Sequence, residues 1–354
     1  MKNIIGFAEL DSMLDVLGGD ERVPREVWET LLCSLSIEGW EYLSMRAREV
    51  TRHYFGNGVY VRALLEISSY CCNNCCYCGL RCINDRAERY RLSKEQVLAA
   101  CREAAGLGFN TFVLQGGEDP KQSDEWLAGV VSAIKAEFPD KAVTLSVGER
   151  TSQGYELLRR AGADRYLLRH ETADERHYAQ LHPQPMSAVN RVRCLYTLKG
   201  LGYQVGSGMI VGTPFQSVEQ IIADLMFLDE LQPHMIGIGP FIPAVGTPFE
   251  CEPSGSVEQT LRLITLLRLR FRRSLIPATT ALATLCDDGT ERGVLAGANV
   301  VMPNITPLNV RDKYTIYNNK KSNGSESAQQ LLLLQEKLQK IGYCIDYSRG
   351  DYPQ

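Results

Sequence analysis

Eight short β-rich runs that alternate with longer amphipathic stretches restrict what this chain can fold into. The runs lie between about residue 56 and residue 310, and parallel strands joined by crossover helices produce such an alternation. The expected strands are 61–68, 111–115, 142–148, 165–171, 204–212, 235–241, 276–281 and 299–304.

Helices between the strands are marked by a repeated capping signal. Ser93, Ser217 and Ser256 are each followed three residues later by a glutamine. At this spacing the two side chains can bind the free N–H groups at the start of a helix. The segment after Ser217 also has the apolar face that a barrel's outer helix needs, formed by Ile221, Ile222, Leu225 and Leu228.

Eight strand–helix units within about 250 residues predict an α/β fold, a TIM-type (β/α)8 barrel. A doubly wound open sheet is the alternative. Residues 1–55 lack strand signals and predict an N-terminal helical extension, with Pro24 suited to begin a helix. We divide the chain into this extension, the barrel at 56–310 and a short C-terminal helical tail at 311–354, in which 318–330 is expected to be an exposed loop before the last helix.

Charge and cysteine placement restrict the partners and the compartment. With 38 Lys and Arg against 42 Asp and Glu, the net charge is −4, so we expect no nucleic acid partner. Acidic residues stand near the start, where a signal peptide would have an apolar run. No apolar stretch of the sequence is long enough to span a membrane. We therefore expect a cytoplasmic protein with no membrane partner.

Six of the 12 cysteines lie between Cys71 and Cys82, which in a reducing compartment indicates metal or iron–sulfur ligation.

Within this cluster only Cys71, Cys75 and Cys78 have the spacing C-x3-C-x2-C. Three thiolates on one loop can hold three irons of a 4Fe-4S cube and leave the fourth iron free to bind a substrate. A zinc site that pairs Cys72 with Cys75 and Cys78 with Cys82 is the alternative. In the iron–sulfur interpretation three thiols have no assigned role: Cys72, Cys76 and Cys82.

The surroundings of these cysteines resemble the signature of the radical S-adenosylmethionine (radical SAM) superfamily. An aromatic residue, Tyr77, stands just before the last cysteine, and the loop follows the first expected strand. The second strand ends in Gly116, Gly117 and Glu118, similar to the superfamily's GGE loop, whose small residues allow close approach to the SAM amino group; a plain turn is the alternative. The resemblance implies an enzyme that uses a 4Fe-4S cluster to cleave SAM and form a 5′-deoxyadenosyl radical.

Further stretches make the resemblance more specific. CGLR with RYRLS, LQGGEDP with VTLSVGE, and GADRYLLRHETA, then GIGPFIP, IPATT and GANVVMPN, are similar in order to the HydE family of FeFe-hydrogenase maturases over about residues 60–310. The related biotin synthase and methylornithine synthase families lack the combination of RHET, IPATT and VMPN. The resemblance implies a role in assembling the two-iron unit of the H-cluster. Its implied substrate is a cysteine-bound iron carbonyl cyanide complex, attacked by the radical at sulfur.

The same resemblance assigns residues to SAM. Thr144 and Ser146 on the third strand, and Arg169 and Glu171 on the fourth, would face SAM, while Arg191 would bind its carboxylate. Alternate residues of one strand point the same way, so Arg169 and Glu171 would share the barrel mouth. The alternatives are a structural ion pair between these two and a solvated helix charge at Arg191.

The resemblance also places Thr279, Thr280 and Met302 in the substrate cavity, although threonine is common in strands and methionine in cores. Tyr314 and Tyr317 follow the barrel and are equally well explained by packing. We find no lysine or carboxylate pair poised for acid–base work at this mouth, which favours a small anionic metal complex over an organic acid.

Partners and rival functions follow from the same features. A cluster that must be reduced implies a low-potential electron donor such as ferredoxin or flavodoxin, together with other hydrogenase maturases. Some family members carry a second three-cysteine motif, but only Cys344 follows Cys286 here, so we expect one cluster. The alternatives are a biotin-synthase-like or methylornithine-synthase-like enzyme acting on an organic substrate, and a non-catalytic iron–sulfur carrier or scaffold.

Overall fold

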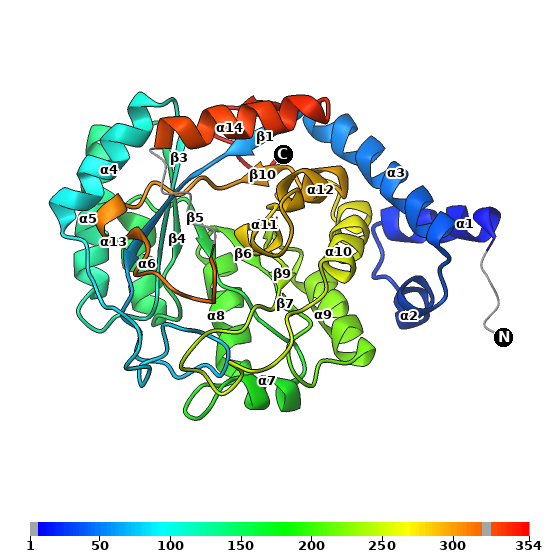
Figure 1. The fold of residues 1–354 in the computed structure, drawn as a ribbon, viewed down its shortest axis with the longest axis horizontal. Helices are drawn as coiled ribbons and strands as arrows, with labels where there is room; N and C mark the ends of the chain where they lie inside the picture. The colour runs from blue at the N-terminus through cyan, green and yellow to red at the C-terminus, as the bar shows by residue number, and fades with distance from the viewer. Residues whose placement is uncertain (1–5, 321–326, 354) are drawn as a thin grey trace.

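The structure is a computed structural model that describes residues 6–320 and 327–353. Its centre is a parallel sheet of six strands in the order β2-β3-β4-β5-β6-β8 (Figure 1). All six residues of β2 are buried, as expected when helices cover one face of the sheet and side chains inside the barrel cover the other. The strands are β2 (Ala63–Ser68), β3 (Thr111–Gly116), β4 (Ala142–Ser146), β5 (Arg165–Leu167), β6 (Gln204–Ser207) and β8 (Met235–Ile236).

Short backbone bridges close this sheet into a ring. Two further segments fill the gap between β8 and β2. They are residues 275–277 and the stretch that contains β10 (Val300–Val301). Eight parallel segments therefore surround one core, which confirms the predicted α/β barrel and excludes the open doubly wound sheet. The closing pairs are Met235 with Leu275, Pro277 with Val300, and Asn304 with Leu64.

The seventh expected strand, 276–281, is largely wrong. Only Leu275 and Pro277 make strand bridges in this region, and α11 (Thr280–Leu285) begins directly after Thr279. A proline has no N–H to donate to a strand ladder, which limits pairing at this point. The β-rich composition of the segment therefore predicts a strand that the chain forms at only two residues.

The fifth and sixth expected strands are each divided in two. β6 is followed by β7 (Ile210–Val211), and β8 by β9 (Gly239–Pro240). Gly208 lies at the first division, where a Cβ atom would come within 2.0 Å of the Gly237 carbonyl oxygen. The two chain segments therefore approach too closely for any side chain at Gly208.

Helices surround the strands on the outside (Figure 1). α4, α9 and α10 begin directly after Ser93, Ser217 and Ser256, and Ser93 forms a complete capping box with Gln96. The apolar face expected for α9 is buried. No helix in the described ranges has both the length and the hydropathy that crossing a membrane requires. The outer helices are α4 (Lys94–Gly106), α5 (Asp124–Glu137), α6 (Ser152–Arg160), α7 (Glu175–Leu181), α8 (Ala188–Gly200), α9 (Val218–Leu231), α10 (Val257–Arg270), α12 (Gly289–Leu295) and α13 (Leu308–Arg311).

The N-terminal extension consists of α1 (Phe7–Gly18), α2 (Arg25–Cys33) and α3 (Ile37–Phe55), which lie at one side of the barrel (Figure 1). Pro24 precedes α2, as predicted. A buried ion pair between Arg270 and Asp229 anchors the extension, because Arg270 also donates to the Gly19 carbonyl and Asp229 accepts from the Val23 N–H at 2.7 Å. The boundaries of the three predicted domains stay predictions.

The C-terminal tail contains a strand that the sequence did not indicate. After α14 (Ser327–Lys340), β11 (Cys344–Asp346) pairs in parallel with β1 (Gly58–Val61), which also pairs with β10. The last described residues then cross the N-terminal end of the barrel, where the Arg349 carbonyl accepts from Thr111 and Arg165 at the starts of β3 and β5. In the predicted loop 318–330, residues 321–326 lie outside the described ranges and 327–330 belong to α14.

Asp351→Asn tests whether this tail stabilises the barrel. The Arg165 side chain is fully buried and donates to Asp351 at 2.6 Å. Because Asp351 is partly exposed, we expect the free energy of unfolding to fall by only about 1–2 kcal/mol in urea denaturation at pH 7. Glu156→Gln, which breaks a surface ion pair with Arg160, should change it by less than about 0.5 kcal/mol.

The same variant has a defined pH dependence. Burial alone would raise the pKa of Asp351, but Arg165 and Arg349 outweigh it and hold the pKa below its usual 3.8. The carboxylate therefore stabilises the fold above pH 3.8 and loses this effect as the pH falls through its folded pKa. The difference between wild type and Asp351→Asn should narrow in acid; a constant difference would show that the charge is not its source.

Candidate active site

One arginine holds the cysteine loop in shape after it leaves the C-terminal end of β2. Arg89 donates to four backbone carbonyl groups of the loop at 2.5–3.2 Å. A planar guanidinium offers five N–H donors and can satisfy several carbonyls that the fold has turned away from water. Arg89 lies in the RYRLS motif, so its position was visible in the sequence although its role was not. The carbonyls belong to Ser69, Leu80, Arg81 and Asn84.

The three cysteines of the predicted triple are close neighbours in this loop. Burial, together with a smaller effect of the nearby Cys78 thiol, raises the pKa of Cys71 to about 12. Burial likewise raises the pKa of Cys78 to about 11. Burial also raises the pKa of Cys75, and the Cys78 and Cys71 thiols act in the same direction. All three are free of disulfides. Partly buried thiols that disfavour each other's ionisation suit a cationic partner that would stabilise their thiolates.

The remaining cysteines of the cluster have different surroundings. Cys72 and Cys82 are exposed, whereas Cys76 packs against the apolar side chains of Leu181 and Phe249. The zinc alternative would have to combine these exposed thiols with the buried ones. Among the described residues, no three His, Cys, Asp or Glu side chains converge on one point that could hold a single metal ion. In a 4Fe-4S cube each thiolate binds a different iron, so the ligands need not converge in this way.

The predicted GGE loop packs directly on the cysteine loop. A Cβ atom at Gly117 would lie 2.5 Å from the Tyr70 carbonyl oxygen and 2.6 Å from the Cys71 Cβ, so only glycine fits there. Gly116 has no such restriction. The Cys72 N–H donates to the Glu118 carbonyl at 2.9 Å, and the Glu118 carboxylate accepts from the Glu149 N–H at 2.8 Å.

Arg191 is buried, so the alternative of a solvated helix charge is wrong. Its Nε donates to Glu149 at 2.5 Å and its Nη1 to the Arg169 carbonyl at 2.7 Å. Burial alone would lower the pKa of Arg191, but Tyr178 and Glu149 outweigh it and the pKa is raised. Glu149 was missed as a site residue, although it ends the VTLSVGE motif.

Glu171 is held in a strained conformation with a buried carboxylate. Its φ of 65° is unusual for a residue other than glycine, and its Oε2 is buried without a hydrogen-bond partner in the described part of the chain. Burial raises the pKa of Glu171, and Arg169 and Arg191 offset this only in part. The alternative of a satisfied structural ion pair does not describe this carboxylate. The neighbouring His170 lies with its Nδ1 3.0 Å from the Ser207 hydroxyl oxygen.

The other predicted contacts vary in how available they are. The hydroxyl oxygens of Thr144 and Thr279 are buried and, like Glu171 Oε2, lack a partner within the described residues. Ser146 ends β4, and Thr280 is the first residue of α11. Met302 packs against a small buried cluster in the barrel core that contains Met235, Leu275 and Val300, so packing accounts for at least part of its role.

Tyr77 is bonded to a residue that the sequence analysis did not single out. Its hydroxyl lies 2.9 Å from His182 Nε2. Burial lowers the pKa of His182 to about 3, so this imidazole is neutral at pH 7. Burial also raises the pKa of Tyr77 well above its usual value, with the Glu171 carboxylate acting in the same direction, so the phenol stays protonated.

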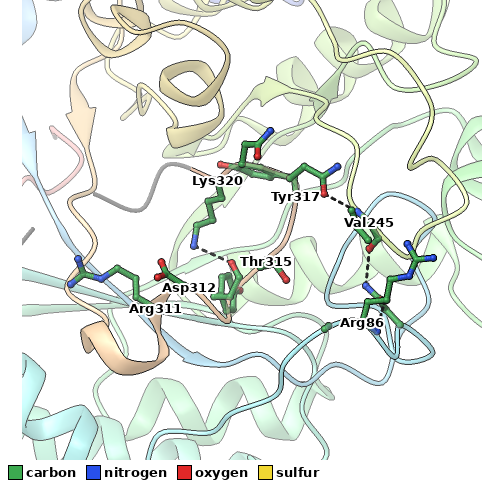
Figure 2. A pocket seen from close by; sticks show the side chains of 12 residues that line it. Arg86, Val245, Arg311, Asp312, Thr315, Tyr317 and Lys320 are labelled. Carbon is green, nitrogen blue, oxygen red and sulfur yellow. Dashed lines mark hydrogen bonds between the residues drawn. The ribbon is translucent and has the colours of Figure 1, made fainter. Parts of the chain in front are cut away.

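The segment after α13 crosses the barrel mouth and lines a cavity of about 370 Å³ (Figure 2). Gly79 in the cysteine loop donates to the Ile316 carbonyl, and the Val245 N–H donates to the Asn318 side chain. The Gln115 side chain at the end of β3 donates to the Tyr314 hydroxyl at 3.4 Å. The lining includes Asn84, Arg86, Val245, Tyr314, Tyr317 and Lys320.

The expectation of a mouth without a lysine is wrong, because Lys320 lies there. Lys320 extends from the cavity rim to the Tyr314 carbonyl (Figure 2) and forms an ion pair with Glu66 of β2. Only 9% of the Lys320 side chain and none of that of Glu66 is exposed. Asn304 donates to the same carboxylate at 3.0 Å. Lys320 falls in the segment 318–330 that its polar composition predicted to be exposed, and that prediction is also wrong at this residue.

Lys320→Met should destabilise the protein strongly, because it leaves the buried Glu66 carboxylate without its cation. We expect a loss of about 3–5 kcal/mol in the free energy of unfolding, measured by chemical denaturation. The matched control is Lys313→Met, which breaks an exposed pair with Glu88 and should cost less than about 1 kcal/mol. Adding Glu66→Gln to Lys320→Met should recover much of the loss. Equal effects of the two lysine variants would contradict a stabilising buried pair.

Comparison with known proteins places this site in a family. Residues 65–228 match the Radical SAM superfamily. The chain is 44% identical to the FeFe hydrogenase maturase subunit HydE of Thermotoga maritima, over 83% of this chain and 83% of that protein. It is 33% identical to 3-methylornithine synthase of Methanosarcina barkeri, over 84% of each. A crystal structure of methylornithine synthase (PylB) matches with a TM-score of 0.81 at 29% identity, covering 94% of this chain and 97% of that one.

The likeness extends well beyond the cysteine motif. It spans most of each chain, including the barrel that brings the cysteine loop, the GGE loop and Glu171 to one mouth. Enzymes of this superfamily use a 4Fe-4S cluster and SAM and require a reductant, which agrees with the partly buried thiol triple and the unpartnered polar atoms described above. The chain therefore belongs to the radical SAM superfamily of enzymes and, within it, to the family of HydE.

Proposed function

We propose that this enzyme performs the HydE step in the maturation of FeFe hydrogenase. The observation that carries the proposal is the identity of 44% to HydE, against 33% to methylornithine synthase over a similar share of the chain. Membership of an enzyme family argues against the non-catalytic carrier, and Glu171 Oε2, buried without a described partner, supplies a ligand-binding group that a carrier does not need.

Cys71, Cys75 and Cys78 would hold the cluster in this proposal. When bound and reduced, the cluster supplies the electron that cleaves SAM to a 5′-deoxyadenosyl radical. The chain's own residues fit this group, because three neighbouring, partly buried thiols with raised pKa values would be stabilised as thiolates by a cationic partner. Gly117 keeps the GGE loop close enough to cover the first of these cysteines.

SAM would bind beside this loop, in contact with the buried carboxylates. Glu118 and Glu171 would accept from the SAM amino group, and Thr144 has a buried hydroxyl free of described partners. Ser146 lies two residues further along the same strand, on the same face.

The structure shows partners for Arg191 Nε and Nη1, so Nη2 is the nitrogen that we assign to the SAM carboxylate. The Tyr77 hydroxyl is bonded to His182, so its side chain would help to hold the cysteine loop.

The proposed substrate is a cysteine-bound iron carbonyl cyanide complex, with Thr279, Thr280 and Met302 on the substrate side of the mouth. Thr279 supports this assignment most directly, because its buried hydroxyl oxygen has no described partner and could donate to a cyanide ligand. The proposed partners are a low-potential donor such as ferredoxin or flavodoxin and the other hydrogenase maturases.

A second candidate is an enzyme of the methylornithine synthase type. The buried pair of Lys320 and Glu66 at the mouth favours it, because such a pair could orient the charged groups of an amino acid. The expected lack of a lysine at this mouth favoured a metal complex, and the position of Lys320 removes that support. The choice between the two therefore depends on sequence identity and on the substrate experiment below.

Cys75→Ala tests the cluster assignment. Each of the three thiolates supplies one corner of the cube, so the reconstituted variant should lose most of the roughly four irons per chain and release no 5′-deoxyadenosine from SAM. The matched control is Cys76→Ala, the neighbouring thiol that packs against apolar side chains, which should keep both properties. Full iron content and SAM cleavage in Cys75→Ala would refute the ligand assignment.

The substrate is tested by stimulation of SAM consumption. The reduced, reconstituted wild-type enzyme is incubated with SAM and either a cysteine-bound iron dicarbonyl cyanide complex, lysine or dethiobiotin. Of these three compounds, only the iron complex should accelerate SAM consumption. It should also yield an adenosylated product, detected by mass spectrometry. Stimulation by lysine with formation of methylornithine would assign the enzyme to the second candidate instead.

A further inference from the structure

The end of α7 is attached to the cysteine loop at two successive residues. The Cys76 N–H donates to the Leu181 carbonyl at 2.8 Å, and the Tyr77 hydroxyl lies 2.9 Å from His182 Nε2. These contacts fall between Cys75 and Cys78, the last two proposed cluster ligands. No other described side chain contacts the Tyr77 hydroxyl at hydrogen-bond distance.

The direction of the bond between Tyr77 and His182 follows from the other imidazole nitrogen. His182 Nδ1 lies 3.1 Å from the Tyr178 carbonyl oxygen, which can only accept, so Nδ1 carries the proton. Nε2 is then an acceptor, and the Tyr77 hydroxyl must donate to it. The bond therefore has a single polarity that a substitution of either partner removes.

The orientation of the imidazole is fixed from two sides. The His182 ring stacks on Tyr178 with centroids 4.0 Å apart, and it meets the Tyr77 ring edge to face at 5.3 Å and 88°. Both arrangements are favourable for aromatic pairs. Only 2% of His182 is exposed, so the ring has little freedom to turn.

Tyr77 in turn lies among the groups that the proposed function assigns to the two cofactors. The charges that act on its phenol come from Glu171 and Arg191 on the SAM side and from Cys75 and Cys78 on the cluster side. A shift of this ring would therefore change how the last two cluster ligands face the SAM pocket.

We propose that His182 is a positioning residue for the cluster loop: by accepting from Tyr77 it sets the Cys75–Cys78 segment relative to Glu171 and Arg191. This inference rests on the proposed cluster and SAM sites and names a residue that acts on them without touching either ligand. It predicts that losing the bond alters the cluster's spectrum and potential and weakens SAM binding while the iron stays bound.

The chain offers a matched control on the same helix. His177 lies within α7, which His182 caps, and is likewise buried, but it forms hydrogen bonds with Thr172, Thr213 and the Pro214 carbonyl, away from the cysteine loop. Substituting it disturbs the packing of α7 to a similar degree without removing a contact to the cluster ligands.

The experiment compares Tyr77→Phe, His182→Leu, His182→Gln, the double variant Tyr77→Phe/His182→Leu and His177→Leu in the reconstituted full-length enzyme. Iron content, the midpoint potential, the EPR spectrum of the reduced cluster with and without SAM, and the Kd of SAM are measured. Tyr77→Phe removes only one oxygen and keeps the test valid if His182→Leu folds poorly. Wild type with no 4Fe-4S cluster or no SAM cleavage would refute the proposed function itself, before any variant is compared.

We expect Tyr77→Phe and His182→Leu to keep their iron, to shift the potential and the SAM-induced change in the spectrum, and to weaken SAM binding by about two- to tenfold. The double variant should be no worse than the more affected single variant, and His182→Gln, whose amide can occupy the Nε2 position, should lie closer to wild type. His177→Leu should lower only the melting temperature. A wild-type potential, spectrum and SAM affinity in Tyr77→Phe, or the same spectral shifts in His177→Leu, would overturn the inference.

Discussion

Closure of the ring of parallel strands is the constraint on which the rest of this structure depends. An open parallel sheet leaves unpaired N–H and C=O groups at both edges, and burying them unpaired is costly. Here the gap between β8 and β2 is closed by isolated backbone bridges at Leu275, Pro277 and Asn304, and not by long runs of strand pairing. Once the ring is closed, the C-terminal ends of all strands meet at one mouth. The cysteine loop, the GGE loop and Glu171 come together for this reason, although about 100 residues separate the first from the last.

The two ends of the barrel have separate tasks. At the N-terminal end, the chain's last described residues satisfy buried groups at the strand starts, including Arg62 and Arg165, and this end contributes stability. At the mouth, polar atoms of Thr144, Glu171 and Thr279 are buried without partners in the described part of the chain. Such groups cost stability unless a ligand satisfies them. A ligand that enters the mouth would satisfy these three atoms.

The charges at the mouth are also unbalanced in a meaningful direction. Around the proposed SAM site alone, three carboxylates, Glu118, Glu149 and Glu171, lie with two guanidinium groups, Arg169 and Arg191, an excess of one negative charge among these five groups. SAM carries a sulfonium and an ammonium group against one carboxylate, an excess of one positive charge. Burial raises the pKa of Glu118 and of Glu171, so a cationic ligand would favour their ionised forms.

Short-range patterns in the sequence were sufficient for much of this description. The alternation of strands and helices predicted the barrel, and spacing within 12 residues singled out Cys71, Cys75 and Cys78. Serine and glutamine three residues apart predicted where helices begin. Each of these depends on neighbours in the chain, whose geometry is set by the local backbone.

Contacts between distant segments were decided only by the tertiary structure. Polar composition gave no means to distinguish an exposed Lys320 from one that reaches Glu66, 254 residues away, because a lysine is polar in either place. Glu149 as the partner of Arg191, His182 as the partner of Tyr77, and β11 as a neighbour of β1 are of the same kind. The sequence by itself determined the alternation of strands and helices, the starts of several helices and which cysteines stand together, because these depend on neighbours in the chain. Only the closed barrel decided which charged and polar side chains face one another across its mouth, because such pairs exist only after segments far apart in the chain have been packed side by side.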